Sequence, residues 1–95
     1  MIAVIFRATI NELDSDYSEV AAMLRDLAIR EYGCREFVAC TEGDTEIAVS
    51  YWESESDIIA WKNDPVHQQA QVKGRGRWYS SYSVQVADIT REYSR

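Results

Sequence analysis

The sequence predicts one α+β domain, residues 1–95, in which a four-stranded antiparallel sheet carries its helices on one face. Three observations support this prediction. A chain of 95 residues has the length of a single domain. Its periodic segments follow the order strand, helix, strand, strand, broken helix, strand. A Glu-Gly-Asp turn between the two middle strands is typical of a hairpin. This element order is that of the split β-α-β, or ferredoxin-like, plan.

The first strand and the first helix have the clearest patterns. Ile2–Thr9 is rich in β-branched residues, which predicts a strand. Apolar residues recur at helical spacing over Tyr17–Ala28, which predicts an amphipathic helix. Asp16 and Glu19 have the spacing of a capping box at its start. Gly33 is expected to end it, because glycine readily enters the left-handed conformation that terminates many helices.

Three further strands are expected. Glu36–Thr41 and Thr45–Glu53 flank the turn 42–44 and predict a hairpin. Ser81–Arg91 alternates apolar and polar residues and predicts the last strand.

The second helical segment is expected in two pieces. Ser54 or Ser56 can cap the first piece. Proline is disfavoured inside a helix but favoured at its first position, so Asp64 is expected to cap a second piece, Pro65–Lys73. The glycines of segment 74–76 are expected to end it.

The sheet is predicted to be apolar on both faces, which suggests a partner. Helices cover one face, and the other normally alternates with polar residues. Here Ile47, Val49 and Tyr51 form one row of the third strand, and Ala48 and Trp52 lie on the other. A second copy of the sheet would cover the free face, so we expect a homodimer that forms a dimeric α+β barrel. Trp52 is expected at the dimer face, and Tyr51 toward the helices.

Charge and composition exclude several classes of partner. The formal net charge is −6, which argues against nucleic acids and anionic membranes, since both require a positive face. No apolar run approaches the length of a membrane span. The N-terminal segment has the pattern of a strand rather than of a signal peptide, so a cytoplasmic location is expected.

Motifs for resident cofactors are absent from the sequence. Cys34 and Cys40 fit no zinc spacing, and one histidine cannot complete a site with them. Neither a nucleophile elbow nor a dinucleotide fingerprint occurs. We therefore expect no tightly bound metal or nucleotide cofactor. The two cysteines are expected as free thiols, and the alternative is a local disulfide between them.

The segment Tyr51–Tyr82 contains all three tryptophans and the only histidine, a composition typical of a small-molecule pocket. Trp61 and Tyr51 are the expected walls, and His67 is the expected general base, accepting a proton from a phenol or enol. The same aromatic residues could instead fill a hydrophobic core, and a lone histidine on a helix often has only a structural role.

Two amides and a basic cluster complete the candidate site. Asn63 and Gln71 lie four residues before and after His67, and would orient a substrate. Because Pro65 interrupts the first interval, only the His67–Gln71 alignment is dependable. The cations could bind an acidic ligand at the pocket mouth or form a solvated face; they are Lys62, Lys73, Arg75 and Arg77.

Three segments carry a resemblance to a known family: SYWES, IIAWKNDPVHQQAQ and GRGRWYSSYSVQVADITREY, within Ser50–Tyr93. They resemble the antibiotic biosynthesis monooxygenase family, through Trp61, His67, the Gly-Arg turn, the Trp78-Tyr79 pair and Tyr82. The resemblance implies a homodimer, and cofactor-independent oxidation of a phenolic or quinol-type aromatic by dioxygen. Arg77 and Tyr82 are then expected to contact the substrate.

The resemblance also implies a second chemistry, oxidative haem breakdown. In that branch a histidine ten residues after the helix tryptophan ligates iron, and an asparagine on the first strand assists. Here Gln71 occupies the place of that histidine, and Phe6 and Arg7 stand where the asparagine would be. The cofactor-independent reaction is therefore the leading hypothesis. The alternatives are a dimer that binds an aromatic ligand without transforming it, and a dimer whose aromatic residues are purely structural.

Overall fold

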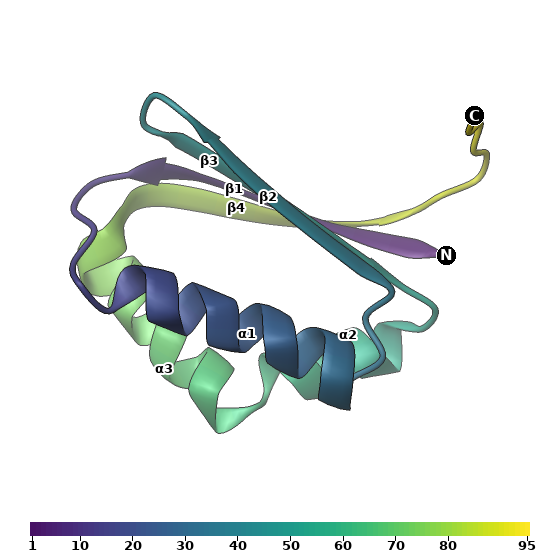
Figure 1. The fold of residues 1–95 in the computed structure, drawn as a ribbon, viewed down its shortest axis with the longest axis horizontal. Helices are drawn as coiled ribbons and strands as arrows, with labels where there is room; N and C mark the ends of the chain where they lie inside the picture. Colours follow the sequence, from purple (N-terminus) through teal and green to yellow (C-terminus); the bar gives the residue numbers. More distant parts are fainter.

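The computed structural model describes all 95 residues and confirms the predicted plan. Its elements are β1 (Ile2–Ile10), α1 (Tyr17–Glu31), β2 (Glu36–Glu42), β3 (Thr45–Trp52), α2 (Glu55–Lys62), α3 (Pro65–Lys73), a π-helical turn (Gly74–Trp78) and β4 (Tyr79–Asp88). The four strands form one antiparallel sheet in the order β2-β3-β1-β4. All helices lie on one side of it (Figure 1). None of the three helices combines the length and the apolar composition of a membrane span.

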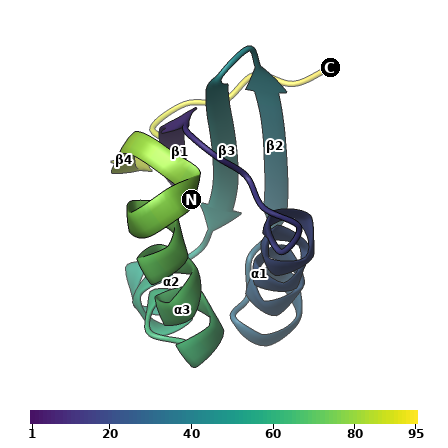
Figure 2. The same ribbon diagram turned by 90° about the vertical axis from the view of Figure 1, so that its left-hand side faces the viewer.

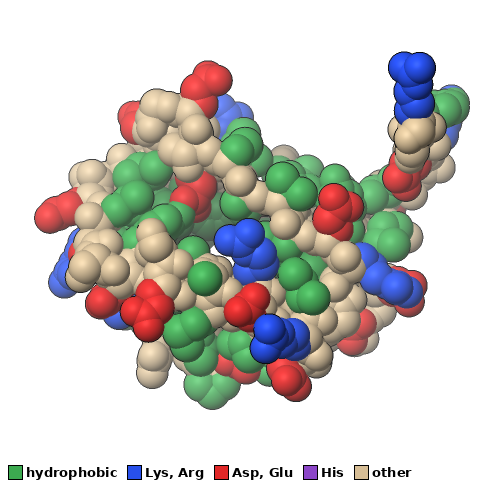
Figure 3. Space-filling model, viewed as in Figure 1, with side chains coloured by type: hydrophobic (Ala, Val, Ile, Leu, Met, Phe, Trp, Pro, Cys, Tyr) green, Lys and Arg blue, Asp and Glu red, His purple; other side chains and the backbone are tan.

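The helix layer is split beneath the sheet. Figure 2 shows α1 below β2 and β3, while α2, α3 and the π-helical turn lie below β1 and β4. Figure 3 shows hydrophobic side chains in the band between the sheet and α1, with charged side chains scattered around it. The helix-facing residues Ala39 and Thr41 of β2 are exposed at this edge, so solvent reaches between the two layers.

Two of the three expected helix caps are confirmed. Ser54 Oγ accepts a hydrogen bond from Asp57 N at 3.3 Å, and Asp64 Oδ1 accepts one from Val66 N at 2.8 Å. The prediction for Asp16 was wrong. Its backbone is already helical and its side chain caps nothing, because the carboxylate is paired with Lys73 Nζ at 3.3 Å.

The glycines differ in what they do. Gly33 has a φ of 78° and follows α1, as predicted. Helix α3 spans Pro65–Lys73, as predicted, but the expected stop at a left-handed glycine is absent. Gly74 has helical angles, φ −60° and ψ −49°, and the chain continues through the π-helical turn to Trp78. A Cβ at Gly74 would meet the Tyr79 ring at 3.3 Å, so this close approach favours glycine. Strand β4 consequently begins at Tyr79 rather than Ser81, and it ends at Asp88 rather than Arg91.

The placement of the two rows of β3 is the main correction to the sequence prediction. Trp52 pairs with Ile2 in register and is fully buried on the helix side, with Trp61 at a ring distance of 5.3 Å. Its Nε1 donates to Ser50 Oγ at 2.8 Å. Tyr51 points to the opposite face, because adjacent residues of a strand alternate. Alternation identified the two rows correctly, but the assignment of Trp52 to the dimer face and of Tyr51 to the helices was inverted.

Replacement of Trp52 by alanine is expected to lower the free energy of unfolding by about 3–5 kcal/mol, because a large cavity would form under β3. Ile59→Ala is the matched control. Ile59 is 53% exposed, and its loss is expected to change stability by no more than about 0.5 kcal/mol. Urea denaturation measures both. Equal effects of the two substitutions would contradict the placement of Trp52.

Candidate active site

His67 and Trp61 form the centre of the candidate site. Trp61 is 8% exposed, packs against Trp52 and Phe37, and donates from Nε1 to the carbonyl of Leu24 at 3.1 Å. The His67 ring stands edge-on to Trp61, with centroids 4.4 Å apart and planes at 82°. Trp61 is therefore a core residue that also forms a rigid wall beside the only imidazole.

Gln71 is the polar partner of His67, one helical turn along α3. Its Nε2 lies 3.3 Å from His67 Nδ1. The predicted His67–Gln71 alignment is thus present. Asn63 is not part of it: this residue is exposed at the end of α2, where its backbone N–H donates to the carbonyl of Ile59 at 3.0 Å. The break before Pro65 separates Asn63 from the imidazole.

The surroundings of His67 favour the neutral imidazole. Burial lowers its pKa below the ordinary value, and the nearby charge of Lys62 acts in the same direction. A backbone hydrogen bond and the Asp64 carboxylate oppose this shift without reversing it. A neutral imidazole has one unprotonated nitrogen, so His67 is able to accept a proton near pH 7.

Tyr51 does not join this group. It lies on the free face of the sheet, in a shallow depression with Arg35 and Ile89. Since Trp61 and His67 are on the other side of the sheet, the three cannot line one pocket within a protomer. The expectation that Tyr51 and Trp61 are walls of the same pocket was therefore wrong in its geometry.

Tyr82 belongs to an uncovered apolar strip on the helix-facing side of β1 and β4. Its ring stacks on Phe6, with centroids 6.0 Å apart and planes at 21°. Tyr82, Val84 and Val86 are 47%, 54% and 50% exposed although α2 and α3 lie on this side of the sheet (Figure 2). We refer to Phe6, Tyr82, Val84 and Val86 as the β4 strip. An exposed apolar surface of this kind is suited to a planar aromatic ligand.

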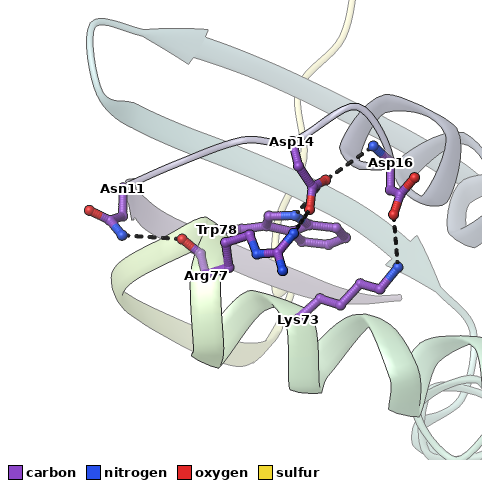
Figure 4. Close-up of polar contacts among 6 residues, drawn as sticks. All are labelled: Asn11, Asp14, Asp16, Lys73, Arg77 and Trp78. Atoms are coloured by element: carbon purple, nitrogen blue, oxygen red, sulfur yellow. Dashed lines mark hydrogen bonds and ion pairs between the residues drawn. The ribbon is translucent and has the colours of Figure 1, made fainter.

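Arg77 is engaged with the loop between β1 and α1 (Figure 4). Its Nη1 lies 2.6 Å from Asp14 Oδ2, and its carbonyl accepts from Asn11 Nδ2 at 3.2 Å. Asp14 Oδ1 also accepts from Trp78 Nε1 at 3.1 Å. Desolvation alone would raise the pKa of Asp14, but the hydrogen bonds from Trp78 and Arg77 outweigh it and lower this pKa.

Two of the four cations of the basic cluster therefore have a structural role. Arg77 and Lys73 are paired with Asp14 and Asp16, so they hold the loop against the π-helical turn (Figure 4). Lys62 and Arg75 form no ion pair. The guanidinium of Arg77 is paired with Asp14, which does not favour the expected clamp for an acidic ligand.

A second polar group inside the sheet–helix space was missed by the sequence reasoning. Glu46, on the helix-facing row of β3, is only 9% exposed. Tyr79 Oη donates to Glu46 Oε2 at 2.7 Å and lies 3.3 Å from Tyr17 Oη. Burial, followed by the bond to Glu46, raises the pKa of Tyr79 and keeps its hydroxyl protonated. The sequence offers one signal, because Glu46 lies in the same alternating row of β3 as Ala48 and Trp52. This position indicates a buried carboxylate only when that row is known to face the helices.

The two cysteines are free, Cys34 buried and Cys40 exposed. Burial raises the pKa of the Cys34 thiol, so it remains protonated. No group of three or more His, Cys, Asp and Glu side chains lies within reach of a single metal ion.

Comparison with known proteins gives a family match and close structural similarity. The model of the family described as antibiotic biosynthesis monooxygenase matches residues 1–73. The uncharacterized protein YqjZ from Bacillus subtilis (strain 168) is 40% identical over 91 residues, which cover 95% of this chain and 80% of YqjZ.

Two solved structures illustrate the similarity of fold. SnoaB, a cofactor-independent oxygenase from Streptomyces nogalater, has a TM-score of 0.81 at 11% identity, covering 99% of this chain and 97% of that chain. Rv0793 from Mycobacterium tuberculosis has a TM-score of 0.82 at 17% identity, covering 98% of each chain. At these identities the likeness shows the shared fold.

The lowered pKa of His67 predicts a specific pH dependence of stability. The unfolded chain binds a proton at His67 near pH 6.5, whereas the folded protein resists this proton. The free energy of unfolding should therefore fall as the pH drops through about 6.5 toward the folded pKa, and the effect should level off below it. His67→Gln should reduce this fall between pH 7 and pH 5. Urea denaturation across this range measures it, and identical slopes for the two proteins would contradict a desolvated His67.

Proposed function

The chain belongs to the antibiotic biosynthesis monooxygenase family, and from this premise we propose that it oxidises a small phenolic or quinol-type aromatic with dioxygen, without a cofactor. The observation that carries the proposal is the half-buried, neutral His67 standing against Trp61 on the helix side of the sheet. The reaction would take place in the space between the sheet and α3. A similar fold in a cofactor-independent oxygenase supports this reading.

The β4 strip offers the binding surface. Phe6 and Tyr82 present stacked rings, and Val84 and Val86 extend the apolar surface along β4. Aromatic rings contribute large contact areas and prefer stacked or edge-on geometries, so a planar ligand would gain from both. Its position between the layers would also displace water from the reacting ring.

His67 would be the proton acceptor, with Gln71 as a positioning residue. The amide of Gln71 has two orientations with the same heavy-atom geometry. With its oxygen toward His67, it accepts from Nδ1–H and leaves Nε2 free to take the proton of a phenol. The proposal requires this orientation. We assign no role in the reaction to Asn63, Arg77 or Tyr51, whose positions lie away from the imidazole.

The reaction balances with dioxygen as the only co-reactant. His67 removes the phenol proton, and the phenolate gives one electron to dioxygen, forming a phenoxyl radical and superoxide. These combine at the para carbon to give a peroxide. Transfer of the proton from that carbon to the outer oxygen breaks the O–O bond, leaving a quinone and hydroxide. The hydroxide takes the proton from the imidazolium, so the products are a quinone and water.

The free face of the sheet supports a homodimer as the working form. Its apolar residues lie on neighbouring strands in one continuous patch: Ile5, Val38, Ile47, Val49 and Tyr51. Val38 is 51% exposed and Ile47 is 37% exposed. A patch of this kind on a small protein marks an interaction surface. Two such sheets packed face to face would bury both patches and leave the two sheet–helix spaces separate.

Aerobic turnover of a panel of phenols and 1-naphthols that carry a hydrogen on the para carbon tests the proposal. Wild-type protein should consume dioxygen and form the quinone, and His67→Ala should lower kcat/KM by about 10²–10⁴-fold, the usual contribution of a general base. Gln69→Ala is the control, because Gln69 is an exposed residue of the same helix.

Unchanged turnover in His67→Ala would remove His67 from the mechanism. Binding of these compounds without oxygen consumption would replace the enzyme with a ligand-binding dimer.

The dimer predicts that Val49→Lys produces a monomer, because the substitution places a charge at the centre of the apolar patch. Ile59→Lys is the matched control on the exposed surface of α2 and should remain dimeric. Light scattering coupled to gel filtration at micromolar concentration measures the mass. A monomeric wild-type protein, or a dimeric Val49→Lys variant, would contradict the face-to-face arrangement.

A further inference from the structure

Glu46 is a charged residue in an interior position that neither the core nor the His67 site accounts for. It lies six residues before Trp52 on β3, roughly 20 Å along the strand at about 3.3 Å per residue. It therefore belongs to the opposite end of the sheet–helix space from the Trp52–Trp61 cluster. A nearly buried carboxylate is costly unless hydrogen bonds or a ligand compensate for its lost hydration.

Only half of this carboxylate is satisfied by the protein. Oε2 accepts from Tyr79 Oη at 2.7 Å, whereas Oε1 has no protein partner. No buried side-chain oxygen or nitrogen in the molecule lacks a partner, so Oε1 must be reached by solvent. Glu46 is thus buried as a residue, but its Oε1 is an unpaired acceptor that solvent or a ligand can reach.

The neighbouring hydroxyls fix the direction of this acceptor. A phenol has a single proton, and Tyr79 gives it to Glu46 because that contact is shorter than the 3.3 Å contact with Tyr17. Tyr17 can then donate to Tyr79. The resulting relay holds Oε2 in place and leaves Oε1 oriented for a donor from a ligand.

The side chains around Glu46 are small on the sheet and aromatic beside it. Ala8 lies directly opposite Glu46 on β1, and Ala48 follows it on the same row of β3. Phe6 stands 5.3 Å from the Tyr79 ring and stacks on Tyr82. Small residues below and aromatic residues beside a polar acceptor are typical of a site for a hydroxylated ring.

We propose that Glu46 and Tyr79 form a recognition site for a free hydroxyl group of the aromatic ligand. The hydroxyl donates to Glu46 Oε1 while its ring packs against Phe6 and Tyr82. This inference rests on the proposed function only for the aromatic nature of the ligand. It adds a specificity: the protein distinguishes hydroxylated aromatics from their O-methyl ethers, because an ether has no proton to donate.

Anaerobic calorimetry with 2-naphthol and 2-methoxynaphthalene tests this, since binding is then measured without turnover. Wild-type protein should bind the naphthol about tenfold more tightly than the ether, as expected for one hydrogen bond to a charged acceptor. Glu46→Gln should reduce the preference to less than about threefold. Glu42→Gln, at the exposed end of β2, is the control and should retain it.

If wild-type protein binds the two probes equally, or binds neither, the inference is overturned, and no variant is needed to show it. An undiminished preference in Glu46→Gln would also overturn it. If Glu46→Gln does not fold, Tyr79→Phe keeps the carboxylate but removes its fixed partner, and an undiminished preference there would overturn the role of the relay.

The two proposals fail in different ways. His67→Gln should retain the preference for the naphthol in anaerobic binding, because His67 is not part of the Glu46 group. Loss of oxygen consumption with the preference intact leaves the hydroxyl site standing. Oxygen consumption without a preference for the naphthol over the ether would contradict the hydroxyl site and leave the proposed reaction unaffected.

Discussion

The alternation of side chains across β3, combined with its register against β1, determines which residues can act together. Pairing Ile2 with Trp52 and Val4 with Ser50 places the even-numbered residues of β3 on the buried, helix-facing side of the sheet. Trp52 can then support Trp61, which supports His67, and Glu46 points into the same space. The odd-numbered residues, including Tyr51, form the apolar free face. A shift of one residue in this register would exchange the two sets.

The helices place further side chains next to the helix-facing row of β3. The break at Asn63 and Asp64 separates α2 from α3, and both lie on the side of β1 and β4 (Figure 2). His67 and Gln71 share one face of α3, 3.3 Å apart. The π-helical turn then brings Trp78 and Arg77 onto Asp14 (Figure 4). Asp14 thereby holds the end of the helix layer against the β1–α1 loop. The interior stays partly uncovered along the β4 strip, which is where a ligand would gain most contact.

Local patterns in the sequence predicted the element order, the caps at Ser54 and Asp64, and the stop at Gly33, because each depends on a few neighbouring residues. Long-range partners were not predictable in the same way. Alternation cannot say which row of β3 meets the helices, so Trp52 and Tyr51 were exchanged. From the sequence, Arg77 is expected to be an unpaired cation. The fold brings Asp14, 63 residues earlier, close enough for its Oδ2 to lie 2.6 Å from Arg77 Nη1. Gly74 was interpreted as a left-handed helix stop, but here it keeps helical angles and the chain continues through a π-helical turn, for which the sequence carries no simple pattern.

An aromatic ligand is expected to bind between the sheet and the helices, and not on the free face of the sheet. A crystal structure of the protein with 2-naphthol, grown without oxygen, tests it most directly. The naphthol ring should lie against the β4 strip, with its hydroxyl within hydrogen-bond distance of Glu46 Oε1. A naphthol bound in the depression beside Tyr51, with the sheet–helix space unoccupied, would contradict it.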